Sequence, residues 1–114
     1  MATDFRDGKT FPRRGREPMG GFLWLARVYD KGRAAKAGTI HDYIYPCPMD
    51  KGMFSRWGIS VGDFEDALLT CSDDAALLRW AQQRIDAAKR DAANHWLLTE
   101  KKPSLDRQDS EEGF

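Results

Sequence analysis

The chain has 114 residues, of which 41% are hydrophobic and 32% are charged. This length fits one ordinary domain, and the composition excludes the disordered and fibrous classes. Basic and acidic residues balance at 18 each, so the formal net charge is zero, which argues against nucleic acid as a partner. We expect residues 1–114 to fold as a single domain.

The charges are unevenly distributed along the chain. Residues 1–40 contain nine Lys or Arg and four acids, whereas residues 41–114 contain nine and fourteen. Such opposite charges are more often satisfied inside a protein than used to recruit an external anion. We therefore expect ion pairs between the two halves.

The N-terminus has no apolar run typical of a secretory signal, and nowhere do eighteen apolar residues follow one another. The two cysteines, Cys47 and Cys71, are too few for a disulfide framework and are typical of reduced thiols. These features predict a cytoplasmic protein that does not span a membrane.

In chain order, residues 1–19 are rich in Arg, Gly and Pro and predict an irregular arm, which Phe5 and Phe11 would anchor. Residues 20–37 have a helical pattern that ends at Gly38, a residue suited to the left-handed conformation after a helix.

Residues 39–45 are rich in β-branched and aromatic residues and stop at Pro46, which predicts an extended segment. A single strand needs a partner. That partner is the arm, another short segment or a second copy in a homodimer, unless the segment is only an extended loop.

Two short helices follow. The first has Asp50 as its expected N-cap and ends at Gly58. The second begins at Ser60, with Asp63 three residues later as the partner in a capping box.

A last helical region begins at Ser72. Its apolar residues recur every three or four positions from Leu77 to Trp96, with a kink expected near Arg84. The tail from residue 101 is polar, and we expect it to be loosely ordered.

The predicted fold is mainly α, a compact bundle of four or five helices with one short extended segment. Within it, residues 1–19 form the arm, 20–100 the helical core and 101–114 the tail.

The helix at 20–37 is apolar on nearly every side, so its charged residues are expected to be partly buried. One interpretation is structural, with Asp30 paired to Arg27, to Arg33 or to the arm. The other is a ligand site in which Arg27, Asp30, Lys31 and Arg33, joined by arginines of the arm, bind a carboxylate or phosphate.

Cys47 lies between two prolines, which hold it on a rigid backbone. A nucleophilic cysteine needs a nearby base or cation, which His41 or Lys51 would supply only if the fold brings one close. A packed, inert thiol is the favoured interpretation, and Cys47 with Asp50 is a weaker catalytic candidate.

The two His and two Cys, at positions 41, 47, 71 and 95, match no metal-ligand spacing, so we expect no metal site. Phosphate loops, dinucleotide fingerprints and nucleophile elbows are also missing from the sequence, and we expect no cofactor.

Segments 20–27, 30–34, 37–39, 43–50 and 57–59, which include Asp-Lys-Gly-Arg-Ala and Cys-Pro-Met-Asp, closely resemble a bacterial family known as domain of unknown function 5069. The likeness covers about residues 10–100. It implies a small, helical, cytoplasmic bacterial protein and implies no particular activity.

Our leading hypothesis is a non-catalytic module that binds a small anionic ligand or a protein partner through the basic face of the first helix and the arm. The alternative is a small cytoplasmic enzyme that uses Cys47 with Asp50 or a nearby basic residue. Whether the protein is an enzyme stays open at this point.

Overall fold

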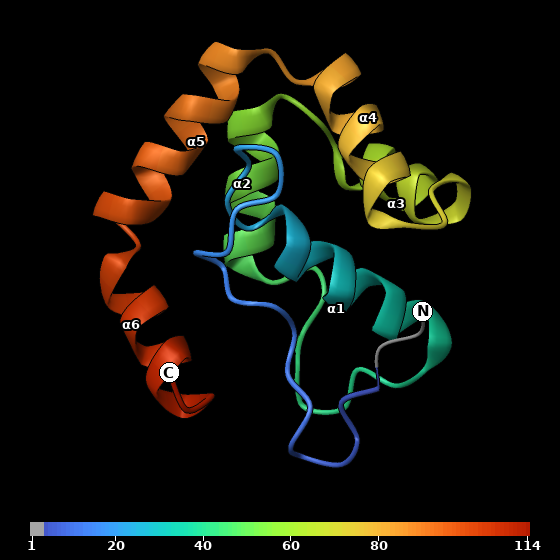
Figure 1. Ribbon diagram of the computed structural model, residues 1–114, viewed down its shortest axis with the longest axis vertical. Helices are drawn as coiled ribbons and strands as arrows, with labels where there is room; N and C mark the ends of the chain where they lie inside the picture. The colour runs from blue at the N-terminus through green and yellow to red at the C-terminus, as the bar shows by residue number, and fades with distance from the viewer. Residues whose placement is uncertain (1–3) are drawn as a thin grey trace.

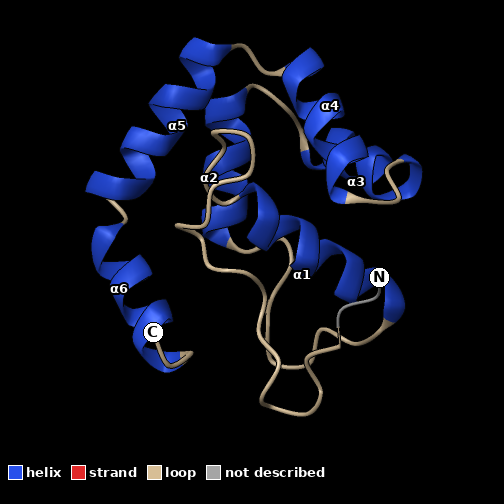
Figure 2. Ribbon diagram, viewed as in Figure 1, coloured by secondary structure: helices blue, strands red, loops and turns tan. Residues whose placement is uncertain are grey.

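The computed structural model describes residues 4–114 as an irregular arm followed by six helices (Figure 1). The helices are α1 (Leu25–Ala37), α2 (Pro48–Trp57), α3 (Val61–Thr70), α4 (Asp74–Arg84), α5 (Ala87–Thr99) and α6 (Lys102–Glu111). Across these residues there is no strand, only one isolated bridge between Met19 and Phe22 (Figure 2). The mainly α prediction is confirmed, with six helices in place of four or five.

The helices surround a shared apolar core. α5 and α6 form an outer arc on one side of α1 and α2, and α3 and α4 lie on the other side (Figure 1). α2 packs against α5, α5 against α6, and α1 against α3. All six helices contribute to the core, whose largest fully buried side chains include Trp24, Trp57, Tyr29, Phe5, Phe22, Phe54 and Phe64.

Several helix ends match the sequence signals. Gly38 and Gly58 follow α1 and α2 in the left-handed conformation, with φ of 73° and 78°. Ser60 and Asp63 form the predicted capping box at the start of α3. These ends were predictable because each depends only on residues within one turn of the helix.

The start of α2 differs from the expectation, because Cys47 and not Asp50 is its N-cap. Pro48 occupies the first turn, where its missing N–H is no loss, so the helix begins three residues earlier than predicted. Asp50 is instead the third residue of a capping box whose acceptor is the sulfur of Cys47.

The expected kink near Arg84 is a complete break. α4 ends at this residue, and Asp86 accepts a hydrogen bond from Lys89 N–H to cap a new helix, α5. The break shifts the apolar pattern of the last helical region by one position. The buried side chains of α5 are therefore Ala93 and Leu97, and not the residues one position before them.

The tail is ordered, contrary to the expectation. Residues 102–111 form α6, with a proline in the first turn, and Leu105 is buried in the core. The polar composition of the tail gave a wrong prediction, because one apolar anchor, Leu105, and several ion pairs stabilise this helix.

The arm and the loop after α1 contact each other. Phe5 is buried as predicted, whereas Phe11 remains 37% exposed and is not an anchor. The N–H of Phe5 donates to the carbonyl of Thr39 at 3.0 Å, but a turn at His41 prevents a strand. Residues 39–45 therefore form the extended loop and not a strand.

The two oppositely charged halves of the chain pair with each other, as expected. The ion pairs that join them are Arg13–Asp74, Arg14–Asp109, Arg16–Asp106, Arg16–Asp109, Arg27–Glu112, Lys31–Asp50 and Lys36–Glu65. The positive charge of the arm and of α1 is therefore largely compensated inside the molecule.

Among residues 4–114, none of the helices combines the length and the apolar character that a membrane crossing requires.

Candidate functional site

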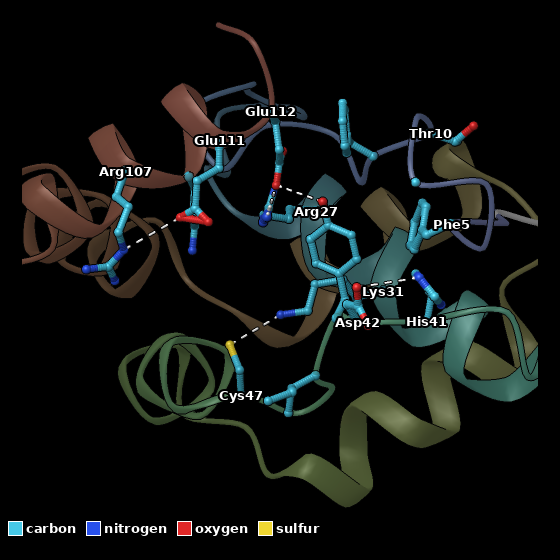
Figure 3. A pocket seen from close by; sticks show the side chains of 15 residues that line it. Phe5, Thr10, Arg27, Lys31, His41, Asp42, Cys47, Arg107, Glu111 and Glu112 are labelled. Carbon is cyan, nitrogen blue, oxygen red and sulfur yellow. Dashed lines mark hydrogen bonds and ion pairs between the residues drawn. The ribbon is translucent and has the colours of Figure 1, made fainter.

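A pocket of about 490 Å³ opens where the arm, the loop at residues 41–44 and the end of α6 meet (Figure 3). Arg27 and Lys31 reach it from α1, and Cys47 reaches it from the start of α2. Its size is that of a site for a small molecule. Three of the six candidate residues from the sequence thus line one concave surface, and Asp50 lies directly behind it.

The sulfur of Cys47 accepts two hydrogen bonds at the edge of this pocket. Lys31 Nζ donates to it at 3.2 Å, and the N–H of Asp50 donates at 3.4 Å (Figure 3). The second donor is a backbone N–H in the first turn of α2, where no carbonyl of the helix can accept it. A cation and a helix N-terminus are typical surroundings of reactive cysteines.

Asp50 lies directly behind this sulfur and is fully buried. Its Oδ2 accepts from Cys47 N–H and pairs with Lys31 Nζ, each at 2.8 Å. Its Oδ1 accepts from the indole Nε1 of Trp24, also at 2.8 Å. Asp50 therefore fixes the ammonium group of Lys31 beside the sulfur.

The backbone of Trp24 is strained at this site. It precedes α1 with φ at 71°, in the left-handed region, which costs a non-glycine residue about 1–3 kcal/mol. Full burial of the side chain and a 2.8 Å hydrogen bond from its N–H to the carbonyl of Gly15 hold it there. Backbone strain of this kind concentrates at functional sites, and here it places the indole N–H of Trp24 for its hydrogen bond to Asp50.

Arg27 forms a second buried contact beside the pocket. Its Nη1 and Nη2 donate to the carboxylate of Glu112 at 3.0 and 2.7 Å, and Tyr43 Oη donates to the same carboxylate at 3.0 Å (Figure 3). Burial, together with the negative charge of Glu112, raises the pKa of Tyr43 to about 12. The end of α6 is thereby fastened to α1 across the pocket.

Asp30 and Arg33 are paired away from this pocket. Asp30 accepts from Arg13 of the arm and from Arg33, at 2.9 and 3.0 Å. Arg33 also lies over the ring of Tyr29, with its guanidinium carbon 4.2 Å from the ring centre. The pairing of Asp30 with Arg33 and the arm matches the structural interpretation of this cluster.

The four predicted ligand-binding residues thus divide between two places. The burial expected for the charges of α1 is confirmed, since Arg27, Asp30 and Lys31 are all at most 4% exposed. Lys31, and neither His41 nor Lys51, is the cation that contacts Cys47. The sequence placed Lys31 and Cys47 in separate candidate sites, and the fold combines them.

Three contributors escaped sequence reasoning, namely Trp24, Tyr43 and Glu112. Glu112 lies in the tail that the sequence predicts to be loosely ordered. A proline followed by an anchor at Leu105 was a usable signal for α6. No local pattern indicates that the helix then returns to Arg27.

Within residues 4–114 no three His, Cys, Asp or Glu side chains converge as metal ligands. What the cluster can supply is a half-buried sulfur nucleophile next to a proton donor, at the edge of a pocket.

A comparison with curated proteins finds no match for this sequence. A family model described as "Domain of unknown function (DUF5069)" matches residues 9–114, which is nearly the whole chain. This agrees with the resemblance seen in the sequence and extends it through α6. The chain therefore belongs to the DUF5069 family.

Proposed function

We propose that the protein is a small thiol-dependent enzyme in which Cys47 is the nucleophile. The observation that carries this proposal is the pair of hydrogen bonds to its sulfur, from Lys31 Nζ and from the first turn of α2, at the edge of a pocket. An activated cysteine requires a neighbouring cation or a helix N-terminus, and it must be accessible to substrate. Cys47 has the cation, the helix N-terminus and the access.

Acyl transfer is the reaction class that this geometry suits. The sulfur of Cys47 forms a bond to the acyl carbon, and the leaving group departs with the electron pair of the broken bond. Lys31 Nζ, 3.2 Å from the sulfur, gives one of its protons to the leaving group and takes the proton of the thiol in its place. Water then breaks the bond between the sulfur and the acyl carbon: its hydroxyl leaves with the acyl group as a carboxylic acid, and its other hydrogen returns the thiol. Asp50 and Trp24 are positioning residues, because they act through Lys31.

The pocket lining favours a substrate with both apolar and polar parts. Phe5, Phe11 and Ile44 offer apolar surface, while Arg107 and Gln108 offer donors. A volume of about 490 Å³ suits a small molecule better than a folded protein partner.

A non-catalytic role in binding a small anion is the second candidate, and the presence of two buried cations, Arg27 and Lys31, in the pocket lining favours it. Asp30 and Arg33 would then support the site through the arm. Each cation already has a carboxylate partner, so an anion must displace Asp50 or Glu112. That cost makes us prefer the enzyme. In both proposals the setting is a bacterial cytoplasm, where Cys47 stays reduced.

The test measures thiol chemistry directly. Iodoacetamide should alkylate Cys47 at least about tenfold faster than it alkylates free cysteine, because Lys31 Nζ lies 3.2 Å from the sulfur. Cys71 is a buried internal control within the same chain and should react slowly. Lys31→Gln should slow Cys47 towards the rate of free cysteine.

An ester probe tests the catalytic step. With p-nitrophenyl acetate, mass spectrometry should find the acetyl group on Cys47, and Cys47→Ser should release nitrophenolate at the background rate. A Cys47 that reacts no faster than free cysteine would overturn the enzyme. Stabilisation by inorganic phosphate that Lys31→Gln abolishes would then favour the anion-binding candidate.

A further inference from the structure

We propose that Lys31 and Cys47 become covalently linked when the protein is exposed to hydrogen peroxide, which makes this pair a reversible oxidation site. The observation is the 3.2 Å contact between Lys31 Nζ and Cys47 Sγ, an amine and a thiol with nothing between them (Figure 3). The inference uses the same sulfur as the proposed enzyme but needs no substrate.

Lys31 is held in place far more firmly than a surface lysine. Its side chain is 5% exposed, and the fully buried carboxylate of Asp50 holds its ammonium group at 2.8 Å. A lysine that has already lost its rotamer freedom reacts with a neighbour at a high effective concentration. The nitrogen is therefore placed to compete with water for an oxidised sulfur.

The sulfur is accessible to a small oxidant. Cys47 is half-buried and lines the pocket, so peroxide can reach it. Cys71, the other cysteine, lines a different pocket with Ala37 and Leu68. The group that an oxidised Cys47 meets first is thus the amine of Lys31 and not a second thiol.

The chemistry proceeds in two balanced steps. The thiol of Cys47 reacts with one hydrogen peroxide, the O–O bond breaks, and the products are a sulfenic acid and water. The ammonium of Lys31 then gives one proton to solvent water, its nitrogen forms a bond to the sulfur, and the sulfenic oxygen takes a second hydrogen from that nitrogen and leaves as water. Sulfur is oxidised, peroxide is reduced, and the product is a sulfenamide that a dithiol can reduce.

The link would change the site as well as protect it. The nitrogen of Lys31 loses its positive charge when it bonds to sulfur, so Asp50 keeps only the hydrogen bonds from Trp24 and Cys47. The nucleophile is also blocked. Oxidation therefore switches off the thiol while keeping it from the irreversible sulfinic acid.

The test treats the full chain with one equivalent of hydrogen peroxide and maps its peptides without reductant. We expect a peptide pair joined through Lys31 and Cys47, lighter than its parts by two hydrogens, which dithiothreitol separates. A link that retains one oxygen between nitrogen and sulfur, formed with a second equivalent of peroxide, supports the same pairing.

Lys31→Arg is the matched control, because it keeps a cation beside Asp50 but has no nucleophilic amine. In this variant Cys47 should gain oxygen and no cross-linked peptide should appear. Oxygen on Cys47 of the unmodified chain with the Lys31 peptide left free would overturn the inference. If Cys47 is still alkylated rapidly in that case, the proposed enzyme stands and only the oxidation site falls.

Discussion

Arg27 of α1 and Glu112 at the end of α6 form a bidentate ion pair whose side chains are only 4% and 5% exposed. Eighty-five positions apart in sequence, they connect the first helix of the chain to its last. This contact fixes α6 against the pocket, where it keeps Tyr43 Oη in the same hydrogen-bonded group.

Replacing Glu112 by Gln should destabilise the protein strongly, because Arg27 would remain buried without its counter-charge. Breaking a buried pair from one side costs about 3–5 kcal/mol in unfolding free energy. Urea denaturation measures the loss. Glu111→Gln is the control, since its side chain is 67% exposed and its change should stay within about 0.5 kcal/mol. Equal stability in the two variants would show that the buried pair contributes nothing.

Acid should destabilise the contact between the arm and α6. Hydrogen bonds and charge from Arg14 and then Arg16 lower the pKa of Asp109 below its ordinary value of 3.8. A lowered pKa in the folded state gives stability that is present above pH 3.8 and lost as the pH falls through the folded value. Asp109→Asn should therefore flatten the curve of unfolding free energy against pH in this acidic range. An unchanged slope would contradict the assignment.

All three tyrosines should resist ionisation in the folded protein. Burial raises the pKa of each of them, Tyr29, Tyr43 and Tyr45. The pKa of Tyr43 reaches about 12. For Tyr45, the hydrogen bond with Glu65 raises the pKa further. At about pH 10, where a free tyrosine is half ionised, tyrosinate absorbance should be lower in the folded protein than in urea. In urea the same absorbance should develop with an ordinary midpoint. Because the unfolded chain ionises first, stability should fall as the pH rises above 10.

Two helical glycines should respond in opposite directions to alanine. A Cβ on Gly52 would overlap the ring of Trp96, where α2 packs against α5, so Gly52→Ala should cost about 1–3 kcal/mol. A Cβ on Gly62, in the first turn of α3, would meet only the hydroxyl of Ser60 at 3.6 Å, an ordinary contact, so Gly62→Ala should stabilise by up to about 1 kcal/mol. Thermal unfolding compares the two. A stable Gly52→Ala variant would mean that Trp96 can move aside.

Part of the site was predictable from the residues alone. The all-round apolar pattern of α1 indicated buried charges, and Arg27, Asp30 and Lys31 are indeed buried. The two prolines beside Cys47 single it out in the sequence, and one of them, Pro48, begins α2. The pairing of Lys31 with Cys47 was not predictable, because sixteen residues and an irregular loop separate them.

The residues alone predict the helical class, the C-terminal ends of α1 and α2, the start of α3 and the mutual compensation of the two charged halves, but not the start of α1 at Leu25 or of α2 at Pro48. These properties depend on periodicity, on residues one turn apart and on the sum of charges, all of which are local or additive. The fold in three dimensions sets which carboxylate meets which cation, and it brings Lys31 and Cys47 to one pocket edge with Asp50 buried behind them. Those pairings depend on how helices cross in space, and a one-residue shift such as the break at Ile85 changes which side chains meet.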